Sequence, residues 1–91
     1  MPVKLYIPLT LRKLADNAAV VHISANSIRG MLAELRIENP NLQERLIDDT
    51  GKIRRALNVY VNDEDIRFLQ NQETPLKEND EVSIVPAIAG G

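Results

Sequence analysis

Residues 19–35, AVVHISANSIRGMLAEL, contain the change of hydrophobic period that decides the fold class. Up to Ile23, apolar and polar side chains alternate with period two, which is typical of a half-buried strand. After Ser27, the apolar residues recur at the spacing of one face of an amphipathic helix, namely Ile28, Met31, Leu32 and Leu35. Ser27 can cap this helix, because its hydroxyl can accept an N–H of the first turn. The segment therefore predicts a strand followed directly by a helix.

Strand patterns also flank this segment on both sides. Residues 3–9 place Val3, Leu5, Ile7 and Leu9 on one face and are expected to form an antiparallel hairpin with residues 19–23, across a short polar connection. The dipeptide Asn39-Pro40 should end the helix, with a short helical turn after it. Further strands are expected at residues 57–61, 66–68 and 81–85. This order predicts an α+β fold in which one helix covers one face of a sheet.

Length and composition restrict the function classes. The 91 residues suit one domain, and a formal charge of −2 disfavours a nucleic-acid partner. The chain contains no cysteine, which excludes disulfides, zinc–thiolate sites and thiol nucleophiles. Its apolar runs are shorter than the roughly 20 residues of a membrane span, and Lys4 and Pro8 interrupt any signal-peptide pattern. We therefore expect a cytoplasmic domain without a membrane or nucleic-acid partner.

Three polar features have plainer interpretations than a reactive site. His22, the single histidine, alternates with buried-type positions and is expected to be an exposed strand residue. Residues 63–65 are acidic but lack the spacing of an EF-hand, which favours a solvated turn. The basic cluster of Lys52, Arg54 and Arg55 is interpreted as a solvated loop. The sequence therefore predicts no catalytic residue and no metal site.

The end of the sequence is an uncharged segment without an evident core role: Pro86, Ala87, Ile88, Ala89, Gly90 and Gly91. Because glycine has no Cβ, a carboxylate on Gly91 would be the least hindered acyl group that a polypeptide can present. Gly90 would let these last residues enter a narrow channel. We expect a folded domain over residues 1–86 and a flexible tail over residues 87–91.

Two stretches, residues 58–68 (NVYVNDEDIRF) and residues 85–91 (VPAIAGG), resemble the ubiquitin-like β-grasp sulfur carriers of the MoaD/ThiS family. The resemblance covers essentially the whole chain. Within the family, the chain looks most similar to carriers that supply sulfur for cysteine biosynthesis. The resemblance implies a β-grasp domain with a mixed sheet of four to five strands covered by one main helix.

The resemblance also implies a carrier and cosubstrate rather than an enzyme. A ubiquitin-activating-type adenylyltransferase, similar to MoeB or ThiF, would use ATP and magnesium to convert the Gly91 carboxylate into an acyl adenylate. The carrier itself would bind no cofactor. A sulfur donor would then leave a thiocarboxylate on Gly91, while the partner's channel holds Pro86, Ala87, Ile88, Ala89 and Gly90. The sulfur would pass to an acceptor such as a cysteine synthase, the molybdopterin synthase large subunit or a thiazole synthase.

Tyr60 and Phe68, two of the three aromatic residues, are either core residues or contacts that dock a partner. Two further function classes stay open. One is a ubiquitin-like modifier joined through Gly91 to a lysine, although ubiquitin-type modifiers carry arginines where this chain has residues 87–89. The other is a β-grasp interaction module with an incidental tail.

Overall fold

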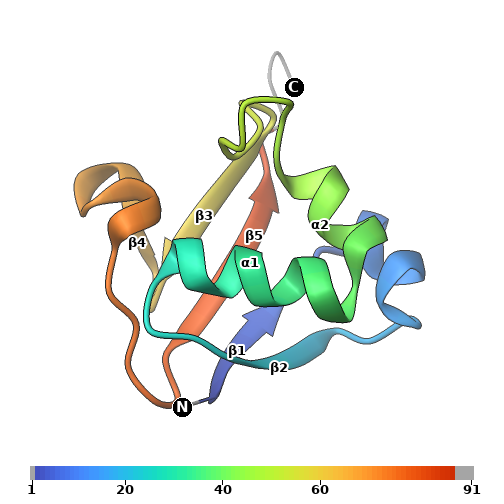
Figure 1. Ribbon diagram of the computed structural model, residues 1–91, viewed down its shortest axis with the longest axis horizontal. Helices are drawn as coiled ribbons and strands as arrows, with labels where there is room; N and C mark the ends of the chain where they lie inside the picture. Colours follow the sequence, from blue (N-terminus) through green and yellow to red (C-terminus); the bar gives the residue numbers. More distant parts are fainter. Residues whose placement is uncertain (1, 88–91) are drawn as a thin grey trace.

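The computed structural model describes residues 2–87, and Met1 and residues 88–91 lie outside the described part. Within residues 2–87 the chain forms five strands, two α-helices and three short 3₁₀ helices (Figure 1). In chain order these are β1 (Pro2–Tyr6), η1 (Leu9–Ala15), β2 (Val20–Ser24), α1 (Ile28–Glu38), α2 (Pro40–Leu46), β3 (Leu57–Val61), β4 (Glu64–Asp65), η2 (Ile66–Phe68), η3 (Asn71–Glu73) and β5 (Glu81–Pro86).

The five strands form one mixed sheet in the order β2-β1-β5-β3-β4. Strands β1 and β5 run parallel at its centre, and the remaining pairs are antiparallel. Helix α1 crosses one face of the sheet, with α2 beside it (Figure 1). The expected α+β layout, with its mixed sheet of four to five strands and one main helix, is confirmed. Within the described residues, every helix is too short or too polar to cross a lipid bilayer.

The core lies between the sheet and the helices α1 and α2, with Ala15 of η1 at its side, and it is entirely aliphatic apart from Met31. Every position predicted for the buried face of α1 is buried, as are the strand positions Val3, Leu5, Ile7, Val59, Val61, Val82 and Ile84. Alternation in the strands puts these side chains on the α1 side. The other face of the sheet carries mainly polar and aromatic residues, together with Val20 and the exposed Val85. His22 is one of these polar residues and is exposed, as predicted.

Both ends of α1 form as the sequence predicts. Ser27 caps the helix, because its Oγ accepts the N–H of Gly30 at 3.0 Å. Asn39 ends α1 and begins α2, where its side chain accepts the N–H of Leu42 at 3.3 Å. Pro40 then occupies the first turn of α2, where its missing N–H costs no hydrogen bond. The short helix expected after Asn39-Pro40 is thereby confirmed.

The structure corrects the prediction at two places. Leu9 was assigned to the buried face of the first strand, but β1 ends at Tyr6 and Leu9 begins η1, with 75% of its surface exposed. Residues 66–68 were predicted as a strand and form the 3₁₀ helix η2. There the side chain of Asp65 accepts the N–H of Arg67 at 2.8 Å, which commits the backbone to a turn.

Candidate functional site

The candidate site begins where β5 ends, at the centre of the sheet. Pro86 lies opposite Leu57 of β3, and the N–H of Ala87 donates to the carbonyl oxygen of Ala56 at 2.7 Å. Both Pro86 and Ala87 are half-buried. Backbone hydrogen bonds therefore tie the chain to the loop before β3 as far as Ala87, the last residue that the structure describes.

The residues to which the sequence assigns the chemistry follow this point. Ile88, Ala89, Gly90 and Gly91 lie outside the described residues. Their assignment to a partner's channel, and that of Gly91 to the adenylate and thiocarboxylate, stays a prediction. Of the residues predicted to enter the partner's channel, the structure describes Pro86 and Ala87.

Strand register places Tyr60 and a second tyrosine on either side of one β5 residue, on the face of the sheet that points away from α1. Ser83 of β5 pairs with Tyr6 on one side and with Tyr60 on the other. Directly paired residues of neighbouring strands have adjacent side chains, so a Tyr6–Ser83–Tyr60 row crosses the centre of the sheet. All three residues are half-buried. Sequence reasoning missed Tyr6, because strand order alone brings it to Tyr60.

Tyr6, at one end of this row, has a shifted pKa. Partial burial of Tyr6, followed by the negative charge of Glu81, raises the pKa of its hydroxyl above the ordinary tyrosine value. Tyr6 is therefore a neutral hydrogen-bonding group throughout the physiological range. A phenol that stays protonated at neutral pH is not a candidate general base.

Phe68 lies at a different place from this row. It belongs to η2, at the edge of the sheet after β4, and 82% of its surface is exposed. The alternative in which Phe68 is a core residue is therefore wrong. Leu69 follows it and is 36% exposed, so two neighbouring apolar side chains face solvent. That Phe68 docks a partner stays a prediction.

The acidic residues 63–65 divide into two kinds. Asp63 is exposed in a turn, as predicted, and has a φ of 74°. Glu64 is also exposed, but it belongs to β4 and pairs with Val61, so the predicted turn ends one residue before it. Asp65 is different: its side chain is 9% exposed and pairs with the Arg67 guanidinium at 2.7 Å. The hydrogen bonds from Arg67 hold the pKa of Asp65 below its usual range. Among residues 2–87, no group of three or more histidine, aspartate or glutamate side chains is arranged to hold a metal ion.

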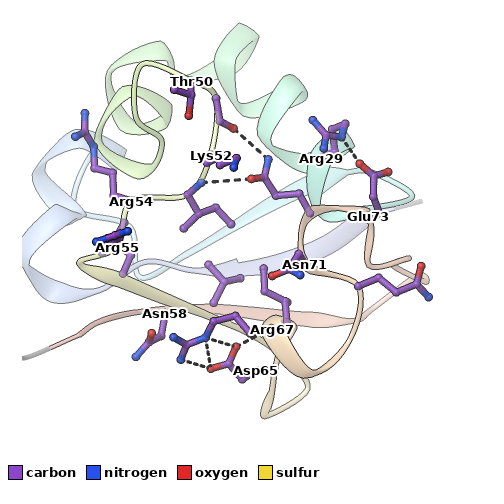
Figure 2. A pocket seen from close by; sticks show the side chains of 17 residues that line it. Arg29, Thr50, Lys52, Arg54, Arg55, Asn58, Asp65, Arg67, Asn71 and Glu73 are labelled. Carbon is purple, nitrogen blue, oxygen red and sulfur yellow. Dashed lines mark hydrogen bonds and ion pairs between the residues drawn. The ribbon is translucent and has the colours of Figure 1, made fainter.

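The basic cluster is exposed, as predicted, but it does more than form a loop. Lys52, Arg54 and Arg55 line one side of a groove of about 890 Å³ (Figure 2). The opposite side comes from η2 and η3, which follow β4 in the sequence. Sequence reasoning missed this groove, because two loops without a common pattern form it.

Comparison with solved structures gives the class of protein. The mixed sheet crossed by one main helix is a ubiquitin-like β-grasp fold, and the crystal structure of Mycobacterium tuberculosis CysO matches it with a TM-score of 0.88 at 34% identity, covering 94% of this chain and 99% of that one. The Amycolatopsis orientalis BexX/CysO complex contains a chain with the same TM-score at 32% identity, covering 98% of this chain and 99% of that one.

Sequence comparison then gives the family. The model of the ThiS family matches residues 5–91. The sulfur carrier protein CysO of Mycobacterium tuberculosis is 37% identical over 93 residues, which covers 100% of both chains. The small archaeal modifier protein 3 of Haloferax volcanii is 34% identical over 65 residues, covering 71% of this chain and 70% of that protein. The chain belongs to the ThiS family.

Proposed function

We propose that this protein is a sulfur carrier of cysteine biosynthesis, whose Gly91 carboxylate is the reactive group. The observation that carries the proposal is the 37% identity to a CysO sulfur carrier over the full length of both chains. The family match through residue 91, which includes Gly90 and Gly91, supports it. The protein would act as a cosubstrate, and its partners would supply the catalysis.

The chemistry follows from the ionisation of an α-carboxyl group. With a pKa of roughly 3.5, this group is an anion at neutral pH and a poor electrophile. An adenylyltransferase of the MoeB or ThiF kind would bind ATP and magnesium and bring the α-phosphorus to a carboxylate oxygen of Gly91. Pyrophosphate leaves as the acyl adenylate forms. A sulfur nucleophile then displaces AMP from the acyl carbon and leaves a thiocarboxylate.

The position of β5 suits a carrier whose reactive end is processed by a separate enzyme. The first half of the strand pairs with both β1 and β3, and its last three residues pair with β3 alone, so the sheet fixes the position of the strand up to its end. A partner can thus locate Gly91 by binding the domain. We propose that Phe68, and the exposed part of Tyr60, belong to that binding surface. The complex of an Amycolatopsis orientalis CysO with BexX supports an encounter between two folded proteins.

The test is thiolation of the intact protein. Incubation with the adenylyltransferase, ATP, magnesium and a sulfide source should add the mass of one oxygen-to-sulfur exchange. Deletion of Gly91, or extension by one alanine, should slow the reaction by about a hundredfold or more, because reacting groups displaced by about 1 Å already lose that much. Both variants keep the described fold intact, so their unchanged unfolding curves are the control. Equally fast thiolation of the extended chain would overturn the proposal.

The acceptor is identified by a second incubation. The thiolated protein is mixed separately with a cysteine synthase, a molybdopterin synthase large subunit and a thiazole synthase. Loss of the added mass with the cysteine synthase alone is the expected result. Loss with another acceptor would keep the carrier role and replace its destination.

A second candidate function is protein modification, which the 34% identity to small archaeal modifier protein 3 favours. In that case Gly91 would form an isopeptide bond to the ε-amino group of a target lysine. Mass spectrometry of conjugates, after protease digestion, would find the residues of the tail attached to lysine. The same analysis on the variant lacking Gly91 is the control.

A further inference from the structure

The carrier function proposed above assigns no role to the groove beside Lys52, Arg54 and Arg55. The groove lies between α1, the loop that precedes β3 and the η2–η3 segment (Figure 2). Its floor is apolar, with contributions from Ile53, Val59 and Ile66. An apolar floor with charged walls is typical of a surface that binds another chain.

The two walls are tied to each other by one side chain. The Oε1 of Gln72 accepts the N–H of Ile53 at 3.3 Å, and its Nε2 donates to the carbonyl oxygen of Gly51 at 3.1 Å. Asp48 stabilises the same loop, because its Oδ1 accepts hydrogen bonds from the N–H groups of Thr50 and Lys52. The groove is therefore preformed, which lowers the entropy cost of binding.

The cations around the groove fall into two groups. Arg29 pairs with Glu73, and Arg67 pairs with Asp65. The side chains of the basic cluster are exposed, and within residues 2–87 none of the three forms an ion pair with an acidic side chain. The groove thus carries an excess of positive charge on a protein whose formal charge is −2.

The wall of the groove formed by Lys52, Arg54 and Arg55, the basic wall, also adjoins the end of β5. Arg54 and Arg55 precede Ala56, whose carbonyl oxygen accepts the N–H of Ala87. The loop that joins α2 to β3 lies at the same end of the molecule as the end of β5 (Figure 1). A protein that receives the chain beyond Ala87 must therefore pass close to this wall.

We propose that the groove docks an acidic segment of the partner protein that processes Gly91. Carboxylates of that segment would pair with Lys52, Arg54 and Arg55, and an apolar side chain between them would rest on the floor. Lys52 and Arg55 lie apart on that wall, while the Arg54 guanidinium turns toward α2, where it donates to the carbonyl oxygen of Glu44 at 3.2 Å (Figure 2). Separated cations suit an extended peptide better than a single small anion. The identity of the partner rests on the proposed function, while the docking contact rests on the groove itself.

The test measures binding of the full-length protein to its adenylyltransferase. The variant Lys52→Glu/Arg55→Glu is chosen because neither side chain makes a hydrogen bond within the described residues. The control Lys13→Glu/Arg36→Glu makes the same change of charge at exposed residues outside the groove. At about 0.05 M salt the groove variant should bind at least about tenfold more weakly than the control, and the difference should shrink at about 0.5 M.

Three outcomes distinguish the possibilities. Equal affinities of the groove variant and the control would overturn the docking proposal. If the groove variant binds more weakly but is thiolated normally at saturating concentration, both the docking contact and the carrier function are supported. If the groove variant binds more weakly and the native chain is not thiolated, the docking contact is kept and the carrier function is overturned. The alternative, a site for a small anion, is tested by titrating the protein with inorganic phosphate and following the amide NMR signals. The proposal would also be overturned if phosphate caused saturable shifts confined to residues 50–58 while the affinity for the partner did not depend on Lys52 and Arg55.

Discussion

The Nδ2 of Asn39 donates a hydrogen bond of 2.6 Å to the carbonyl oxygen of Leu14. The same side chain caps α2 through its Oδ1. One residue therefore begins a helix and fastens η1, the excursion between β1 and β2, to the end of α1. Because η1 carries Ala15 into the core and packs Leu14 against it, this bond helps to close one side of the core.

Substitution of Asn39 should separate these two roles. Asn39→Ser keeps a capping hydroxyl but cannot reach Leu14, so we expect a loss of about 1 kcal/mol in the free energy of unfolding. Asn39→Ala also removes the cap and should lose about 1 kcal/mol more. Urea denaturation measures both. A serine variant as stable as the native protein would mean that the bond to Leu14 contributes nothing.

Leu32→Ala should lower the free energy of unfolding by about 2–5 kcal/mol, because Leu32 is buried between α1 and the sheet. Ile37→Ala is the matched control on the same helix, since 77% of Ile37 is exposed, and it should change stability by less than about 0.5 kcal/mol. Equal effects of the two substitutions would show that the buried face of α1 is wrongly assigned.

Acid should destabilise the protein partly through Asp65. The bonds from Arg67 depress the pKa of this carboxyl in the folded state. Its contribution is therefore complete above the unfolded value of about 4 and is lost as the pH falls through the depressed folded value. Asp65→Asn should flatten the decline of the urea midpoint below about pH 4. Asp63→Asn, in the neighbouring turn, leaves the Arg67 contact intact and should retain the native decline.

Phe68→Ala should leave stability within about 0.5 kcal/mol of the native value, because the side chain is largely exposed. If Phe68 docks the adenylyltransferase, the same change should weaken that complex by about tenfold. Leu9→Ala is the control, since Leu9 is a comparably exposed apolar residue on η1. Unchanged affinity would remove Phe68 from the docking surface.

The spacing of apolar residues and the helix-capping residues predicted most of the fold. Helix α1 was predicted from Ser27 to Asn39 because both of its ends carry local chemistry that the structure confirms. Leu9 shows where this reasoning fails. The N–H of Ile7 donates to the carbonyl oxygen of Ala19, Pro8 offers no further donor, and the chain turns into η1. An apolar residue beyond that point still fits the alternating pattern, so alternation alone does not mark the end of the strand.

The candidate site was predictable only where it depends on sequence alone. Gly90 and Gly91 can be identified from their position after β5 and their family resemblance. The Tyr6–Ser83–Tyr60 row and the groove arise from strand order and from Gln72, which joins residues distant in the sequence. Such features require long-range contacts, and hydrophobic period contains no information about them.

The parallel pairing of β1 with β5 has a consequence for synthesis on the ribosome. The strand made last among the described residues is the one at the centre of the sheet. A nascent chain that has emerged only as far as Asp80 has the β1–β2 hairpin and α1 but lacks the strand between β1 and β3, so its apolar faces remain uncovered. We therefore expect any fragment that stops before Glu81 to stay unfolded and open to proteolysis until β5 is made.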